Sequence, residues 1–323
     1  MYRTLFALFS SLAAPVAAGD FALDWPIDCV LGDSCHIQQY VDRDPGPGAQ
    51  DFTCNGLTYD GHKGTDIALP YLSDMQTGVT VRAAADGIVA GLRDGMPDQY
   101  ATKANAAEIK DRECGNGLVL RHAGGWETQY CHMKSGSLRV AKGDRVPAGT
   151  ALGEVGLSGK TQFPHLHLSL RKDGAVVDPF QPDSSAACGT ASGASLWAQP
   201  VAYEAGGFLG AGFSTGVPAY DAIKSGTTAA KGEMLAKDAP AMVFWAYAFG
   251  GREGDTLTLT IDGPGGKMID QKATLKKDQA QFFRAAGKRL RRAAWPAGLY
   301  TGIARLMRDG AEVDRIIQPI RID

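Results

Sequence analysis

The sequence predicts a mainly β protein, in which a compact antiparallel β domain is followed by a smaller immunoglobulin-like β-sandwich domain. The chain has 323 residues, enough for two ordinary domains. Its 41 glycines are spread along the chain without a Gly-X-Y period, which favours many tight turns. A stretch rich in serine, alanine and glycine, PDSSAACGTASGAS at residues 182–195, is typical of a linker, and all six histidines precede it.

The overall composition is that of a folded chain. Hydrophobic residues make up 44% and charged residues 21%, so disorder throughout the chain is not expected. The formal net charge of −2 offers no electrostatic reason for a nucleic-acid partner, and we expect none. No apolar run reaches the roughly 20 residues that span a bilayer, so we expect a protein that is not membrane-spanning. The sequence leaves the oligomeric state open.

The N-terminus has the features of a signal peptide at residues 1–18. Arg3 supplies a positive charge, residues 5–16 are apolar or small, and Val16 and Ala18 are the small residues that a signal peptidase site requires. We therefore expect cleavage after Ala18 and export of the chain. No cysteine follows the cleavage point directly, so we expect no lipid anchor.

The cysteines of the exported chain are predicted to form disulfides, because their number is even and the compartment is oxidising. They are Cys29, Cys35, Cys54, Cys114, Cys131 and Cys188. The sequence does not choose among the possible pairings. A short loop closed by Cys29 and Cys35 is plausible, and Cys114 with Cys131 could tie the ends of a hairpin. One or more free buried thiols are the alternative.

The first part, residues 19–181, is predicted to consist of short strands and turns. The strand-like segments are residues 79–89, which turn at Asp86-Gly87, and residues 118–122, 126–132, 152–155 and 166–170. The second and third of these flank Ala123-Gly124-Gly125, which is a hairpin signature. Residues 99–110 have a helical composition and lie inside a long connection.

The second part, residues 196–323, is predicted to be a β-sandwich, since about seven short strands fall in its length. Strand-like segments are residues 242–249, 256–261, 299–307 and 313–322. WPAGLY at residues 295–300 is similar to the turn that enters a late strand of immunoglobulin-like sandwiches. Pro319 restricts the last strand to a sheet edge or a bulge. The basic run RAAGKRLRR at residues 284–292 is interpreted as a solvated hairpin, with contact to anionic polymers as the alternative.

An alternating segment, HLHLSLR, places two histidines on one face of a strand. The leucines at 166, 168 and 170 fall on one face, and His165, His167 and Ser169 fall on the other. Two imidazoles that point the same way can converge on one ion or one reacting group. The alternative is a polar strand that faces solvent and carries two incidental histidines.

A second pattern places His62 four residues before Asp66. Gly61 and Gly64 make a helix unfavourable here, so we expect a loop that leads into a strand near Asp66. Neutral imidazole and carboxylate are ligands that suit Zn²⁺. With one histidine of the HLH pair they would make three protein ligands and leave a position for water, as in catalytic zinc sites. Spacing does not decide which of the pair is the ligand.

The remaining histidines carry weaker signals. His132 ends the second strand of the predicted hairpin, where a lone histidine is most often structural. His122 lies beside the hairpin turn and His36 follows a cysteine, and both are interpreted as structural.

Four motifs in this order resemble those of the lysostaphin-type (LytM-like) peptidoglycan endopeptidases: GHKGTDIA, CGNGLVLRHAGGWETQYCHM, VAKGDRVPAGTALGEVGLSG and PHLHL. The resemblance covers about residues 59–179 and implies a zinc metallopeptidase domain with a compact antiparallel β fold. It implies that His62, Asp66 and His167 bind one Zn²⁺ per chain. It also implies that His132 and His165 are catalytic and assist the attacking water and the transition state.

Three departures from the family pattern stand out. Phe163 replaces a common glycine, Ser169 replaces a common acidic residue, and residues 93–113 form a long insertion between two core strands. None of them removes a ligand. We expect the insertion to be a partly ordered flap that borders the substrate groove, because long loops in compact domains are usually functional or disordered. A surface excursion far from the zinc is the alternative.

The resemblance implies a secreted zinc metalloendopeptidase that hydrolyses peptide cross-links in peptidoglycan and so remodels the cell wall. A periplasmic location is expected, with an extracellular one possible, and the expected bond joins a D-amino acid to meso-diaminopimelate. The first alternative is a non-catalytic cell-wall binding or amidase-activating protein on the same fold, and the second is a general secreted protease. The role of the second domain is unassigned.

Overall fold

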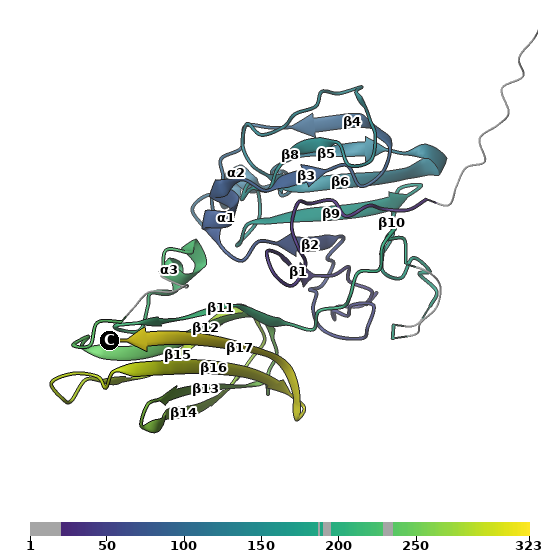
Figure 1. The fold of residues 1–323 in the computed structure, drawn as a ribbon. Helices are drawn as coiled ribbons and strands as arrows, with labels where there is room; N and C mark the ends of the chain where they lie inside the picture. Colours follow the sequence, from purple (N-terminus) through teal and green to yellow (C-terminus); the bar gives the residue numbers. More distant parts are fainter. Residues whose placement is uncertain (1–20, 187, 190–194, 229–234) are drawn as a thin grey trace, which may run out of the picture.

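The computed structural model describes residues 21–186, 188–189, 195–228 and 235–323, and the predicted signal peptide lies outside this range. Two β-rich bodies make up the described chain, the first before the predicted linker and the second after it (Figure 1). Strands dominate both bodies and helices are short, which confirms the mainly β prediction. Within the described residues, no helix has the length and apolar character needed to cross a membrane.

The first body is built on one large antiparallel sheet. Its strands run in the order β1-β2-β9-β6-β5-β4-β7, with β10 paired to β9, and β3 pairs separately with β8. The strands are β1 (His36–Gln39), β2 (Thr65–Ala68), β3 (Thr80–Arg82), β4 (Gly87–Arg93), β5 (Asn116–Arg121), β6 (Trp126–Met133), β7 (Arg145–Val146), β8 (Ala151–Glu154), β9 (His165–Lys172) and β10 (Ala175–Val176). The helical segments are α1 (Leu72–Thr77), α2 (Ala106–Ile109) and a 3₁₀ turn at Ala123–Gly125.

The local patterns of the first part are confirmed. The predicted hairpin is β5 and β6, joined through Ala123–Gly125. Leu166, Leu168 and Leu170 of β9 are buried in the core, as the alternation requires. The segment of helical composition at residues 99–110 contains only the four-residue helix α2.

The second body is a sandwich of two antiparallel sheets, with orders β11-β12-β15 and β14-β13-β16-β17. Its strands are β11 (Gly207–Ser214), β12 (Ala241–Gly251), β13 (Thr256–Gly263), β14 (Gly266–Thr274), β15 (Gln279–Arg289), β16 (Gly298–Arg308) and β17 (Ala311–Ile322), and its helix is α3 (Tyr220–Ser225). Side chains from both sheets, including Phe244, Leu259 and Tyr300, form one core. The predicted sandwich is therefore present, and its immunoglobulin-like character stays a prediction.

Two details of the second body concern its edges. β17 lies at a sheet edge, where Pro319 faces Thr301, as expected for a proline in a strand. The interpretation of residues 284–292 as a hairpin is wrong, because Arg284 to Arg289 belong to β15 and pair along β12. Phe282 and Ala286 of that strand are buried in the core of the second body. Burial of this apolar face, and not the charge of the basic residues, therefore fixes the position of the strand in the sheet.

The two bodies are joined by a polar and aromatic contact. In β1, the Ile37 amide donates to Glu204 and the Gln38 side chain donates to the Ala280 carbonyl, at 3.1 and 2.9 Å. The His36 ring packs on Phe249, with centroids 4.3 Å apart. Leu196 and Trp197 pack against the core of the first body, although the predicted second domain begins at residue 196. That boundary stays a prediction.

Three disulfides bind the described cysteines, and none of these cysteines is free. Cys29–Cys35 and Cys114–Cys131 are the two pairs that the sequence suggested. The third, Cys54–Cys188, spans 134 residues and anchors the predicted linker to the first body. Arg43 also donates to the carbonyls of Gln181 and Asp183, at 2.7 and 2.9 Å. These disulfides fit an exported protein.

Loss of the long disulfide is expected to cost more stability than loss of the short one. The chain-entropy relation gives about 5 kcal/mol for Cys54–Cys188 and about 2 kcal/mol for Cys29–Cys35. Urea unfolding of the paired serine variants Cys54→Ser/Cys188→Ser and Cys29→Ser/Cys35→Ser measures the difference. Thiol titration of unfolded, non-reduced wild-type protein should find no free thiol. Equal destabilisation by the two pairs would contradict the entropic account.

Candidate metal centre

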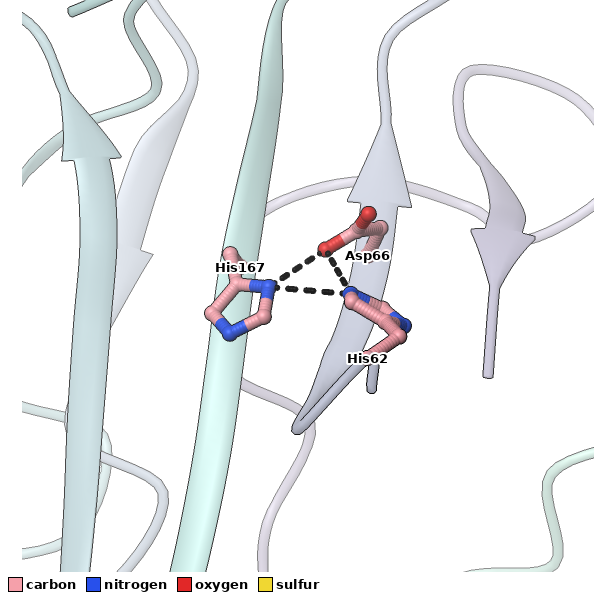
Figure 2. A group of neighbouring side chains, drawn as sticks. All are labelled: His62, Asp66 and His167. Carbon is pink, nitrogen blue, oxygen red and sulfur yellow. Dashed lines mark hydrogen bonds and ion pairs between the residues drawn. The ribbon is translucent and has the colours of Figure 1, made fainter. Parts of the chain in front are cut away.

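Three side chains meet where β2 runs beside β9. The antiparallel register places Asp66 of β2 directly opposite His167 of β9, so both side chains leave the sheet on the same face. His62 comes from the loop just before β2, where Gly61 has φ +74°. The His62 amide donates to the Tyr59 carbonyl at 3.0 Å, which turns the chain back toward the sheet. Figure 2 shows the three side chains pointing toward one another.

The donor atoms of this cluster are close enough to share one ion. Asp66 Oδ1 lies 2.7 Å from His167 Nδ1 and 3.2 Å from His62 Nε2, and the two nitrogens are 3.2 Å apart (Figure 2). The side chains of His62 and Asp66 are buried, and that of His167 is 16% exposed. Two imidazole nitrogens and one carboxylate oxygen match the donor set of a catalytic zinc site.

The contacts behind the cluster orient both imidazoles. His62 Nδ1 lies 2.7 Å from the Tyr40 carbonyl, which can only accept, so Nδ1 carries the proton and Nε2 is free for a ligand bond. His167 Nε2 lies 2.9 Å from Ser169 Oγ, which leaves Nδ1 facing Asp66. Partners of this kind orient metal-binding histidines, and the Tyr40 carbonyl also fixes the tautomer of His62. Ser169, a departure from the family pattern, thus supplies a contact of this kind.

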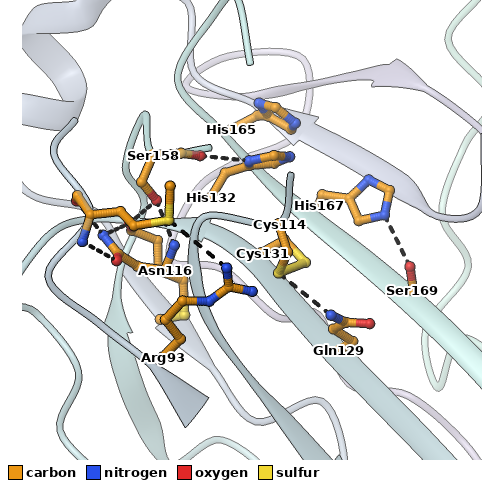
Figure 3. Close-up of a disulfide and its surroundings, with 12 residues drawn as sticks. Arg93, Cys114, Asn116, Gln129, Cys131, His132, Ser158, His165, His167 and Ser169 are labelled. Carbon is orange, nitrogen blue, oxygen red and sulfur yellow. Dashed lines mark hydrogen bonds between the residues drawn. A yellow bond between two sulfur atoms is a disulfide. The ribbon is translucent and has the colours of Figure 1, made fainter. Parts of the chain in front are cut away.

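The other two predicted histidines lie beside the cluster. The ring centroid of His132 is 4.5 Å from that of His165 and 6.0 Å from that of His167. His165 Nε2 lies 3.5 Å from Asp66 Oδ1. His132 Nδ1 and His165 Nδ1 lie 2.8 and 2.9 Å from the carbonyls of Ser158 and Phe163, so each ring keeps Nε2 for another partner (Figure 3).

The backbone of His132 has an unusual conformation. Its φ of +62° lies in the left-handed region, which costs energy for a residue with a side chain. The adjacent Cys131 is bonded to Cys114, and the His132 amide donates to the Cys114 carbonyl at 2.8 Å. Figure 3 shows the disulfide directly beneath the histidines. The disulfide and this hydrogen bond therefore hold His132 at the end of β6, turned toward the other site residues.

Electrostatics lower the pKa values of Asp66, His132 and His167 and raise that of His62. Burial raises the pKa of Asp66, but the neighbouring His62 and His165 outweigh it and hold the pKa well below its usual range. Burial, with His165 and His167 nearby, lowers the pKa of His132 far below its usual value. Burial also lowers the pKa of His167, against the opposing effect of Asp66. Burial lowers the pKa of His62 as well, but Asp66 reverses the shift.

The cluster opens into a groove of about 960 Å³. Asp66, His132, His165 and His167 line its floor. The insertion lines one side with Ala101, Thr102, Lys103, Ala106, Ile109, Lys110 and Glu113, so the prediction that it borders the groove is confirmed. The second body contributes Tyr220, Lys224, Ala280 and Gln281, which the sequence analysis did not anticipate.

The two histidines that the sequence analysis interpreted as structural lie outside the groove. His122 lies 2.8 Å from the Asp86 carbonyl and His36 packs in the contact between the bodies, so neither lines the groove. Sequence reasoning missed Gly64, whose local signal was only that of a turn. A Cβ at Gly64 would lie 2.6 Å from His167 Nε2 and 2.7 Å from the Leu168 carbonyl.

Comparison with known proteins agrees with this geometry. Residues 60–179 match peptidase family M23. The DD-carboxypeptidase/endopeptidase Mpg of Neisseria meningitidis serogroup B is 34% identical over 120 residues, which cover 36% of this chain and 22% of that protein. The peptidoglycan DD-endopeptidase ShyA of Vibrio cholerae serotype O1 is 31% identical, with coverage of 37% and 22%. The matched segment thus spans about a fifth of these relatives.

A solved structure is also similar. The catalytic domain of the prophage-encoded M23 protein EnpA from Enterococcus faecalis has 25% sequence identity and a TM-score of 0.33, covering 54% of this chain and all of that domain. The three residues of the His–Asp cluster lie within the segment that matches the family model. Residues 60–179 match the model of peptidase family M23, so the resemblance expected from the motifs is confirmed.

Substitution of Gly64 should disturb the cluster without touching a ligand. In Gly64→Ala, the new methyl would overlap both the His167 ring and the backbone of β9, and we expect a loss of about 1–3 kcal/mol in stability together with weaker metal binding. Thermal unfolding and metal analysis of purified protein measure both effects. Gly56→Ala is the matched control, because its Cβ would meet nothing within 4 Å. Identical behaviour of the two variants would refute this role of Gly64.

Proposed function

We propose that this chain is an exported zinc metalloendopeptidase that hydrolyses peptide cross-links in peptidoglycan. The observation that carries the proposal is the cluster of His62, Asp66 and His167, which lies beside His132 and His165. All of these residues except His62 line one groove. The Vibrio cholerae relatives, whose names describe peptidoglycan DD-endopeptidases, support the substrate class. Three disulfides are consistent with a periplasmic or extracellular location.

In this proposal His62 Nε2, Asp66 Oδ1 and His167 Nδ1 hold one Zn²⁺. The donor set, the short separations and the backing contacts from Tyr40 and Ser169 fit that ion. When bound, Zn²⁺ supplies a Lewis acid that polarises the scissile carbonyl and lowers the pKa of water to about 7. The low pKa of Asp66 keeps the carboxylate charged for this task.

His132 and His165 act on the reacting groups through their Nε2 atoms. One neutral imidazole accepts the proton of the attacking water and returns it to the leaving amine. The other carries a proton on Nε2 as well as on Nδ1, as an imidazolium, and donates from Nε2 to the oxyanion that develops on the substrate, a contact that contributes about 2.7–4 kcal/mol when well placed. Carbonyl contacts at both Nδ1 atoms fix the rings for these roles. The positive φ of His132 aims its side chain at the groove.

Digestion of purified cross-linked peptidoglycan tests the proposed reaction. Zinc-loaded, full-length mature protein should convert dimeric muropeptides to monomers, and mass spectrometry of the products should show one added water per peptide bond cut. Cleavage between a D-amino acid and meso-diaminopimelate is the expected bond. Stoichiometric zinc without turnover would favour the non-catalytic, amidase-activating alternative. Comparable digestion of casein would favour a general protease.

The two histidines of the HLH motif should respond differently to substitution. His167→Ala removes a ligand, so zinc should fall well below one per chain, because two remaining ligands hold the ion poorly. His165→Ala should keep one zinc per chain and lose hydrolysis. Inductively coupled plasma analysis of both variants, with circular dichroism to verify folding, gives the comparison. Zinc lost from His165→Ala but kept by His167→Ala would reverse the assignment.

A further inference from the structure

We propose that Lys224, in the second body, determines substrate specificity by binding a carboxylate of the peptide that occupies the groove. The inference rests on the proposed function for the identity of the peptide. Residues of both bodies line the groove. The floor is the histidine cluster, and part of the opposite wall is made by α3 and by the start of β15. Figure 1 shows α3 between the two bodies.

The helix that carries Lys224 is fixed in place by both bodies. Gly226 ends α3 with φ +77° and packs so closely on α1 that a Cβ there would lie 2.3 Å from Ser73 Oγ. Tyr220 donates from its hydroxyl to the Gln281 carbonyl at 3.0 Å, and its ring stacks on Phe283. A side chain on this short helix is therefore held in a defined position relative to the site.

The ammonium group of Lys224 is positioned by aromatic rings. Its Nζ lies 4.5 Å from the ring centroid of Tyr100, in the insertion, and 5.3 Å from that of Tyr220. Such cation–π contacts orient a lysine side chain, and the attraction is stronger when the ammonium group has lost part of its hydration shell. The side chain is only 20% exposed. Lys224 thus joins the insertion to the second body at the edge of the groove.

The charge of Lys224 has a weak partner of its own. Its ion pair is with Asp221, whose side chain is 95% exposed and whose Oδ1 is 3.8 Å away. An exposed pair of this kind is worth little in water. A carboxylate brought into the groove would meet a partly desolvated ammonium, for which charge-assisted hydrogen bonds are stronger.

The remaining charges of the groove favour an anionic ligand. Lys103, Lys110 and Lys160 also line it, whereas its acidic residues are Asp66, engaged with the histidines, and Glu113. The three other lysines are exposed, so they attract anions through a screened field. The meso-diaminopimelate residue expected at the cross-link is a dicarboxylic acid, so one carboxylate stays free when the other forms a peptide bond. This chemistry matches the groove and assigns the second body a part in substrate choice.

The test compares a substrate that has its carboxylates with one that lacks them. A purified muropeptide dimer is used as it is, and after conversion of its free carboxyl groups to amides. For the full mature protein we expect Lys224→Met to raise KM for the native dimer about tenfold or more, as expected for loss of a charge-assisted hydrogen bond, with kcat changed little. On the amidated dimer the variant and wild type should have equal KM. Lys224→Arg should retain most of the preference, and Lys276→Met, at an exposed position outside the groove, should behave as wild type.

The outcomes separate this inference from the proposed function. Equal loss on both substrates would show that Lys224 only supports the fold, and an unchanged KM on the native dimer would show that it binds no carboxylate; either result overturns the inference while hydrolysis stands. If wild-type protein cleaves neither dimer, the proposed function fails. Calorimetric titration of the same dimers then tests the inference alone: tighter binding of the native dimer that disappears in Lys224→Met supports it, and equal affinities overturn it.

Discussion

The pairing of β2 with β9 is the constraint on which the site depends. It sets Asp66 opposite His167, so a carboxylate and an imidazole reach from neighbouring strands to within 2.7 Å. A shift of the register by one residue would send these side chains to opposite faces of the sheet. The leucines that alternate with the histidines of β9 prevent such a shift, because they are buried in the core below. The hydrophobic core thus defines the geometry of the polar cluster above it.

Residues outside the cluster complete this arrangement. The Tyr40 carbonyl selects the tautomer of His62, and the Ser169 hydroxyl orients the ring of His167. The Cys114–Cys131 disulfide lies directly before His132, whose backbone would otherwise relax from its left-handed conformation. The site is therefore rigid because a disulfide, backbone carbonyls and a packed strand each restrict one imidazole. This rigidity is what a preorganised catalytic centre requires.

The second body changes the shape of the site without contributing to the cluster. Its contacts with β1 and α1 hold it beside the groove, where Gln281 and Lys224 extend the wall formed by the insertion. The Lys224–Tyr100 contact joins two segments that a minimal M23 domain, matched over residues 60–179, would not bring together in this way. Side chains of both bodies therefore line the groove, and the proposed role of the sandwich in recognition rests on this shared lining.

The sequence by itself determined the features that depend on short-range order. Alternation in HLHLSLR, the glycine turn between β5 and β6, and the His62–Asp66 spacing all act within a few residues. The motifs that contain them predicted the segment that matches family M23 and five candidate site residues. Local pattern did not show β11, β15 or the Cys54–Cys188 bond, nor which residues of the second body reach the groove. β11 and β15 depend on pairing with β12, and the other features depend on contacts between the two parts of the chain. Only burial of both cores and their mutual packing selects such contacts.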